Sequence, residues 1–252
     1  MARRENDNYP TDPLLARWVV KHAVNIAGFD PPEICNSELR STQDLDMLEP
    51  CCGDTAPFAA AAHSLGMRAH GFDIRDIEAP AWADPSRFRP GVSYQKEFEN
   101  LLSKETGIPL VPSRYPKVIA TNPPFSDGLQ IAKYCVDVLD PWGVCAFIVK
   151  VAFIGTQARS AWFMKNPPSE VWIISKRPSF TGDGKTDMAQ EYCVVFWLGS
   201  ALYESMKRLN GGHYFTRLHW LNNKGLMTPK QPKRVVIEKE KSDGTETAPQ
   251  NC

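Results

Sequence analysis

The sequence has 252 residues, a length that suits one α/β domain with modest additions. Hydrophobic residues make up 42% and charged residues 23%, values typical of a globular protein, and the net charge of zero gives no overall argument for a polyanionic partner. Seven cysteines without a Cys-x-x-Cys pair fit neither a disulfide framework nor a zinc site, so we expect no metal. The sequence has no signal-peptide pattern and no apolar stretch long enough for a membrane span, which indicates a cytoplasmic protein without membrane contacts.

Apolar runs alternate with helix-like segments from about residue 45 onward, and this alternation predicts a doubly wound α/β fold with a mostly parallel sheet. Prolines in segment 78–95 predict a surface loop, and the glycine-rich segment 175–190 predicts a polar excursion. The composition of residues 239–252 predicts a disordered tail. The expected regular segments are 45–48, 57–65, 68–72, 117–120, 129–139, 144–149, 158–165, 171–174 and 192–198.

The sequence Asn122-Pro123-Pro124-Phe125 follows an apolar strand directly. In open α/β sheets ligands bind at the carboxyl ends of strands, and two prolines make this turn rigid. The Asn122 side-chain oxygen and the Pro123 carbonyl can accept both hydrogens of one amino group, while Phe125 can stack on the flat ring that carries it. The turn therefore predicts a site for a planar amine, although a proline-rich loop that only caps the strand is the structural alternative.

A second turn, residues 49–56, connects a strand to a helix and contains Gly53, which allows a nucleotide-like ligand to approach the backbone. One glycine is weak evidence for such a site. The next short strand ends in Asp73, about 20 residues later, which is the spacing at which an acid binds ribose hydroxyls. Together the two features predict a nucleotide-like cofactor.

Three motifs in this order resemble those of the amino-group methyltransferases that act on adenine in DNA. They are Glu-Pro-Cys-Cys-Gly-Asp-Thr at 49–55, Phe72-Asp73 and Asn-Pro-Pro-Phe at 122–125. The resemblance extends to Tyr9-Pro-Thr-Asp-Pro and to Glu97-Phe98, and covers about residues 9 to 198. It implies a class I methyltransferase fold with a seven-stranded sheet whose last strand is antiparallel, in a single domain over residues 1–238.

The resemblance also implies the roles of individual residues. Asn122, Pro123, Pro124 and Phe125 form the catalytic site, in which Asn122 and Pro123 orient the amine and Phe125 stacks on an extruded base. S-adenosylmethionine is the implied cofactor. Its implied binding residues are Tyr9, Thr11, Glu49, Cys51, Gly53, Asp54, Asp73, Ile74, Glu97, Phe98 and Asn122. Thr55 stands where the family commonly has glycine, and an extra residue separates Thr11 from Pro13.

The resemblance implies transfer of a methyl group to the N6 amine of adenine in DNA, as in restriction-modification systems. The segment 175–190 is also similar to a hairpin of small phage methyltransferases, and Lys176, Arg177 and Lys185 there are candidates for phosphate contacts. Recognition of a target sequence is expected in 175–190 or 200–235. Adenine in RNA and a glutamine side chain also present a planar amine and remain alternatives. A module that binds cofactor or DNA without catalysis is a third reading, and the oligomeric state stays open.

Overall fold

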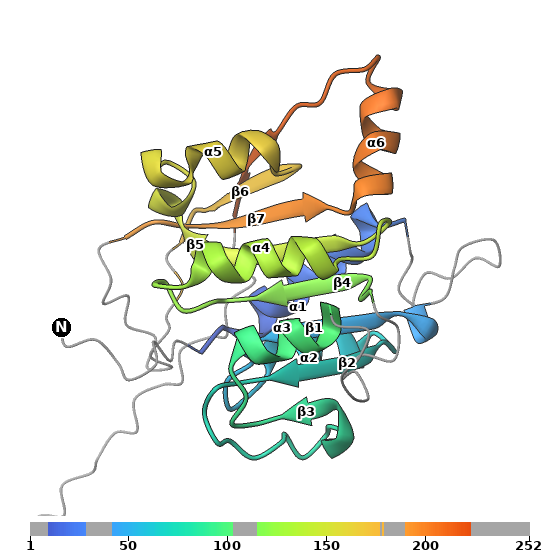
Figure 1. The fold of residues 1–252 in the computed structure, drawn as a ribbon, viewed down its shortest axis with the longest axis vertical. Helices are drawn as coiled ribbons and strands as arrows, with labels where there is room; N and C mark the ends of the chain where they lie inside the picture. Colours follow the sequence, from blue (N-terminus) through green and yellow to red (C-terminus); the bar gives the residue numbers. More distant parts are fainter. Residues whose placement is uncertain (1–9, 29–41, 103–114, 177, 179–189, 223–252) are drawn as a thin grey trace, which may run out of the picture.

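The computed structural model describes residues 10–28, 42–102, 115–176, 178 and 190–222, and in these ranges a central sheet is covered by helices on both faces (Figure 1). The helices are α1 (Pro13–Ile26), α2 (Pro57–Ser64), α3 (Tyr94–Leu102), α4 (Gly128–Val138), α5 (Gln157–Lys165) and α6 (Ser200–Leu209). Short 3₁₀ helices are η2 (Thr42–Asp44), η3 (Pro85–Arg87) and η4 (Val151–Phe153). The strands are β1 (Asp46–Pro50), β2 (Arg68–Phe72), β3 (Phe88–Arg89), β4 (Val118–Thr121), β5 (Val144–Lys150), β6 (Glu170–Ile174), β7 (Tyr192–Leu198) and β8 (Arg217–Leu221).

The strand order in the sheet is β3-β2-β1-β4-β5-β7-β6-β8. Strand β7 runs antiparallel to both of its neighbours, and the other described pairs are parallel. This is the predicted class I methyltransferase arrangement, with two corrections. The sheet has eight strands rather than seven, and the antiparallel strand is followed in the chain by β8, which pairs in parallel with β6.

The order of strands reverses between β1 and β4. From β1 the chain passes through α2 to β2 on one side, whereas β4 pairs with β1 on the other side. In open α/β sheets a crevice forms at the carboxyl ends of strands at such a reversal. The turns that follow β1, β2 and β4 therefore lie at the edge where this fold binds ligands.

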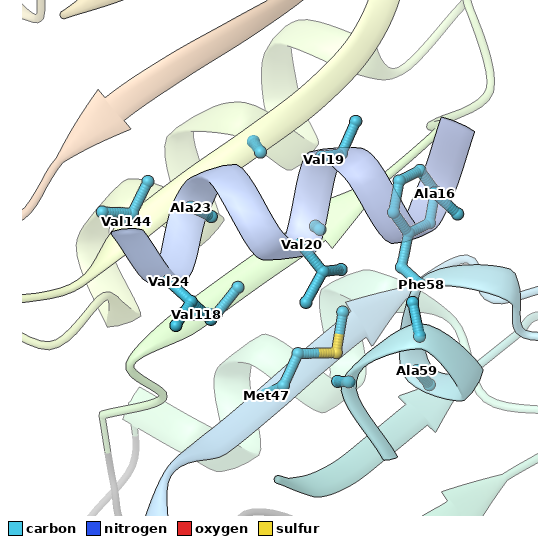
Figure 2. Packing of buried hydrophobic residues seen from close by; sticks show 14 of the residues in the cluster. Ala16, Val19, Val20, Ala23, Val24, Met47, Phe58, Ala59, Val118 and Val144 are labelled. Atoms are coloured by element: carbon cyan, nitrogen blue, oxygen red, sulfur yellow. The ribbon is translucent and has the colours of Figure 1, made fainter. Parts of the chain in front are cut away.

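Alternation along the strands divides the apolar residues between two cores. On β1, Met47 packs in one core with α1 and α2, and Leu48 packs in the other with α3 and α4. Figure 2 shows the first core, in which α1 lies across the sheet and its first turn, at Ala16, is next to Phe58 at the start of α2. Because the central strands β1, β4 and β7 are buried along their whole length and helices cover both faces of the sheet, the doubly wound prediction is confirmed.

Helix α1 is held at both ends by polar contacts. Asp12, the extra residue between Thr11 and Pro13, caps the helix, since its carboxylate accepts from the Leu14 amide at 2.9 Å. Near the other end, His22 hydrogen-bonds Glu170 of β6 at 2.7 Å. Burial raises the pKa of Glu170, but hydrogen bonds from His22 and Trp172 outweigh it and lower that pKa to about 2. The helix is thereby fixed to the sheet by a buried carboxylate.

All nine predicted segments correspond to helices or strands of the structure, and the bounds of 68–72 and 192–198 match those of β2 and β7. The predicted loop 78–95 is only partly a loop, because η3, β3 and the start of α3 lie in it. Segment 200–235 includes α6 and β8, which extends the sheet. The predicted tail lies outside the described residues. Among the described residues no helix has the length and apolar character needed to span a membrane.

Candidate functional site

The turn between β1 and α2 has an unusual backbone. Cys51, Gly53 and Ala56 all have positive φ, at 58°, 63° and 41°. For a residue with a side chain this conformation costs about 1–3 kcal/mol, and it persists only where surrounding contacts enforce it. Gly53 adopts it without that cost. Such strain clusters at functional sites, and here it lies in the turn that the sequence predicts to approach a nucleotide-like ligand.

Glu49, at the end of β1, is buried, and its carboxylate accepts from the Ala59 amide of α2 at 2.7 Å. The N-cap residue Ala56 has no side chain that can make this bond, so Glu49 satisfies the helix terminus from outside the helix. Burial raises the pKa of Glu49 well above its ordinary value, although amide hydrogen bonds oppose this effect. Glu49 therefore shapes the turn; its predicted contact with a cofactor stays a prediction.

Asp73 follows β2 and is the acid predicted to bind ribose hydroxyls. One carboxylate oxygen accepts from the Gly53 amide at 2.8 Å, which joins the two turns directly. The other accepts from the Arg75 amide at 2.9 Å and from its guanidinium at 3.0 Å. Arg75 also reaches Asp54 at 3.2 Å. The predicted acid is thus at the expected place, and Arg75 lies over it.

The remaining predicted cofactor residues differ in exposure. Ile74 is 57% exposed beside Asp73, an uncommon state for isoleucine and one that leaves an apolar surface open at the edge. Glu97 and Phe98 of α3 are both fully buried. Arg89 donates to both Glu97 oxygens at 3.1 Å, and Phe98 stacks on Tyr134 with ring centroids 5.3 Å apart. Ile74 can meet a ligand in this arrangement, whereas Glu97 is engaged in an ion pair inside the protein.

The turn at residues 122–125 lies directly beside the first turn. The Thr121 hydroxyl at the end of β4 donates to the Pro50 carbonyl at the end of β1, so the two strand ends are tied together. Asn122 is half-buried and Pro123 is buried. The Asp127 amide donates to the Pro124 carbonyl at 3.1 Å as α4 begins. The two turns therefore lie side by side at the carboxyl ends of β1 and β4.

Phe125 extends toward the neighbouring strands β5 and β7. The Lys150 ammonium nitrogen lies over the Phe125 ring, 4.0 Å from its centroid. The Tyr192 ring centroid is 6.2 Å from that of Phe125, and Tyr192 is the register partner of Lys150 across the β5–β7 pair. An aromatic face, a cation and a phenol ring therefore meet next to the Asn122 turn.

The cysteines of the first turn are not arranged for covalent chemistry. Burial raises the pKa of the Cys51 thiol, and the negative charges of Asp73 and Asp127 raise it further. A thiol that stays protonated is a poor nucleophile. Cys135, Cys145 and Cys193 are buried among apolar residues. Within the described ranges no group of three or more His, Cys, Asp or Glu residues is arranged to hold a metal ion.

The structure brings most of the predicted site residues to the edge formed by the carboxyl ends of β1, β2 and β4. It also places Arg75 and Lys150, which were not predicted, at this edge. Thr11 is buried at the start of α1, whose first turn lies next to α2. Lys176 is exposed after β6, while Tyr9, Arg177 and Lys185 lie outside the described residues. Sequence reasoning missed Arg75 and Lys150. A signal for Lys150 was present, since it is the one charge that ends the apolar run 144–150.

No family model matches the chain, and no curated protein matches it in sequence. Solved structures match its fold. A chain of the DrdV–DNA complex is 12% identical with a TM-score of 0.52, over 85% of this chain and 27% of that one. The M protein of the type I restriction enzyme EcoKI is 13% identical with a TM-score of 0.44, over 76% and 44%. The rRNA methyltransferase AviRa from Streptomyces viridochromogenes is 12% identical with a TM-score of 0.44, over 81% and 91%.

The chain spans less than half the length of the first two of these relatives. At such low identities the likeness concerns the arrangement of helices and strands. The likeness to the chain of the DrdV–DNA complex agrees with the strand order described above and concerns the fold alone.

Proposed function

We propose that this protein transfers a methyl group from S-adenosylmethionine to the N6 amine of adenine in DNA. The observation that carries the proposal is the junction of two turns at neighbouring strand ends. The turn after β1 contains Gly53 and is bonded to Asp73, and the turn after β4 contains Asn122 and Phe125. The Thr121–Pro50 hydrogen bond joins the two strand ends. A donor of methyl groups and an acceptor amine need this proximity to react.

The first turn fits the proposed cofactor in three respects. Gly53 has no Cβ where a ligand approaches, Asp73 is an acid at the ribose position, and Ile74 offers an exposed apolar surface for the adenine ring. Arg75 now holds Asp73, so ribose hydroxyls must share or replace that contact. The bound cofactor would supply an electrophilic methyl group on a sulfonium.

The second turn provides acceptors for the amine. With Asn122 and Pro123 each accepting one N–H hydrogen, the nitrogen lone pair is directed at the methyl group rather than delocalised into the ring. With the amine held by Asn122 and Pro123, the bound cofactor would supply the methyl group as its C–S bond breaks, and the amine nitrogen would lose one proton to solvent. Phe125 provides the stacking surface for the ring. No thiol takes part, because the pKa of Cys51 is raised.

DNA is the substrate that we test first. The motif order resembles that of DNA adenine methyltransferases, and the chain of a protein–DNA complex shares the fold. An adenine in duplex DNA is out of reach unless it is rotated out of the stack. The exposed edge near Phe125 would receive such a base.

The test is to incubate the protein with radiolabelled S-adenosylmethionine and, separately, with unmethylated genomic DNA, total RNA or extracted protein. We expect label in DNA, recovered as N6-methyladenine after digestion. Label only in RNA or in a glutamine of protein would contradict DNA as the substrate but retain the chemistry. Cofactor binding without transfer to any of the three would contradict an enzymatic role.

A further inference from the structure

The Lys150 side chain occupies a position that the methyl-transfer chemistry leaves unexplained. It ends β5 at the ligand-binding edge, and its ammonium lies over the face of Phe125 at 4.0 Å from the centroid. A base stacked on an aromatic ring requires a separation of about 3.5 Å. The ammonium therefore takes the space that a base on this face would need.

Phe125 also packs against the interior of the protein. Phe125 packs against the buried cluster that includes Tyr192, and the two ring centroids are 6.2 Å apart. A cation–π contact at a partly exposed site contributes about 0.5–1 kcal/mol. Stacking of a base on an aromatic side chain contributes about 1–3 kcal/mol. Since stacking is stronger, a base can displace the ammonium from the face of the ring.

Charges at the edge are divided between its two halves. The turns after β1 and β2 contain Asp54 and Asp73, which both pair with Arg75. Cations follow β5 and β6, where Lys150, Arg159 and Lys176 are found. Glu191, exposed at the start of β7, is the acid on that second side among the residues described. The cations of the second half suit a polyanion.

We propose that Lys150 is a substrate-binding residue, which moves from the Phe125 ring to a phosphate of the target strand when the base stacks on that ring. This inference rests on the proposed function and assigns a residue to its substrate side. Lys150 lies over the Phe125 ring, so its ammonium group is close enough to contact a phosphate of the nucleotide whose base stacks there. One lysine–phosphate contact releases counterions and makes binding depend on salt.

The test is fluorescence anisotropy with a short single-stranded oligonucleotide containing one adenine, titrated at several salt concentrations. For Lys150→Met we expect Kd to rise about three- to tenfold and the slope of log K against log salt to fall by about 0.7, the value for one phosphate on a single strand. Lys150→Arg keeps the charge and should retain the slope. Cofactor affinity should be the same in all variants.

The matched control is Lys165→Met, which removes the same charge at the exposed end of α5. The residue after Lys165 is Asn166, whose carbonyl accepts a hydrogen bond from Trp197. Trp197 pairs with Cys145 near the start of β5. Lys165 therefore lies at the end of the sheet opposite to Lys150. Unchanged or tighter binding by Lys150→Met, with an unchanged salt slope, would overturn the role of Lys150. Wild-type protein that binds the oligonucleotide but does not methylate DNA contradicts only the proposed function. Wild-type protein without salt-dependent binding overturns both.

Discussion

The two halves of the ligand-binding edge are built differently. On the β1–β2 side, buried carboxylates are fixed by backbone amides, as when Asp73 accepts from Gly53 and Glu49 from Ala59. On the β5–β7 side, a flexible lysine lies on an aromatic ring. The first half is therefore held by backbone hydrogen bonds, whereas the proposed movement of Lys150 would rearrange the second. A small cofactor can bind to a preformed site. A base that is rotated out of a nucleic acid needs a stacking surface from which another group, here the Lys150 ammonium, can be displaced.

The difference predicts that substitutions in the two halves separate cofactor binding from substrate binding. Between the halves lies Asn122, directly after β4, which the resemblance assigns both to the amine and to the cofactor and which the proposed chemistry uses for the amine. The variants below test that division, in order of decreasing effect.

Asn122→Ala should reduce methyl transfer by about 10²–10³-fold, because one of the two acceptors that direct the amine lone pair is removed. Isothermal titration with S-adenosylhomocysteine should give an unchanged Kd. Asn122→Asp keeps an acceptor oxygen and should retain more activity than the alanine variant. An equal loss of transfer and cofactor affinity in Asn122→Ala would place this residue on the cofactor side of the edge.

Asp73→Asn should weaken cofactor binding about tenfold to 100-fold, since a charged acceptor is worth about 1.5–3 kcal/mol. The same change removes the charge that holds Arg75, so a fall in melting temperature is expected as well. Asp76→Asn, an exposed acid three residues further on, is the control. If Asp73→Asn and wild type bind the cofactor with equal affinity, the Asp73 carboxylate serves only to bind the Gly53 amide and Arg75.

Ile74→Ser should weaken cofactor binding about three- to tenfold, because it removes apolar surface expected to cover the adenine ring. Ile74 is 57% exposed, so the melting temperature should hardly change. Leu209→Ser, on a residue that is 79% exposed in α6, controls for the loss of a surface aliphatic group. A change in melting temperature without a change in affinity would contradict the stacking role.

The fold was largely predictable because its strands are apolar and short. Segments 68–72 and 192–198 are bounded by polar or glycine-containing turns, and their ends were found correctly. Strands β3 and β8 were missed because neither has an apolar run: β3 is Phe88–Arg89, and most of β8 is exposed. As edge strands they are held by pairing with a neighbour, which leaves little pattern in the sequence.

The candidate site was predictable where a strand end supplies the residue. Asp73 and Asn122 each follow a strand directly, so the topology brings them to the same edge. Arg75 and Glu97 could not be placed in this way, because their partners depend on side-chain packing. The ion pair between Arg89 and Glu97 joins β3 to α3, and no spacing in the sequence predicts this pair.

Glu49→Gln should change stability mainly at higher pH, where wild type has to ionise a buried carboxylate and the variant does not. Burial raises the pKa of Glu49 in the folded protein above its unfolded value. Its contribution to stability is therefore fully present below the unfolded pKa and is lost as pH rises through the folded pKa. Glutamine does not titrate, so urea unfolding of the variant should depend less on pH above about 4.5 than that of wild type.

Glu78→Gln, at an exposed position, should keep the wild-type dependence and serves as the control. The same pH dependence in wild type and Glu49→Gln would mean that the buried carboxylate stays charged and stabilised by the Ala59 amide. In that case the rigid half of the edge would carry a full negative charge facing the cofactor. Unfolding measured with and without S-adenosylhomocysteine would then show a ligand effect that Glu49→Gln reduces, whereas a neutral Glu49 predicts equal ligand effects in both proteins.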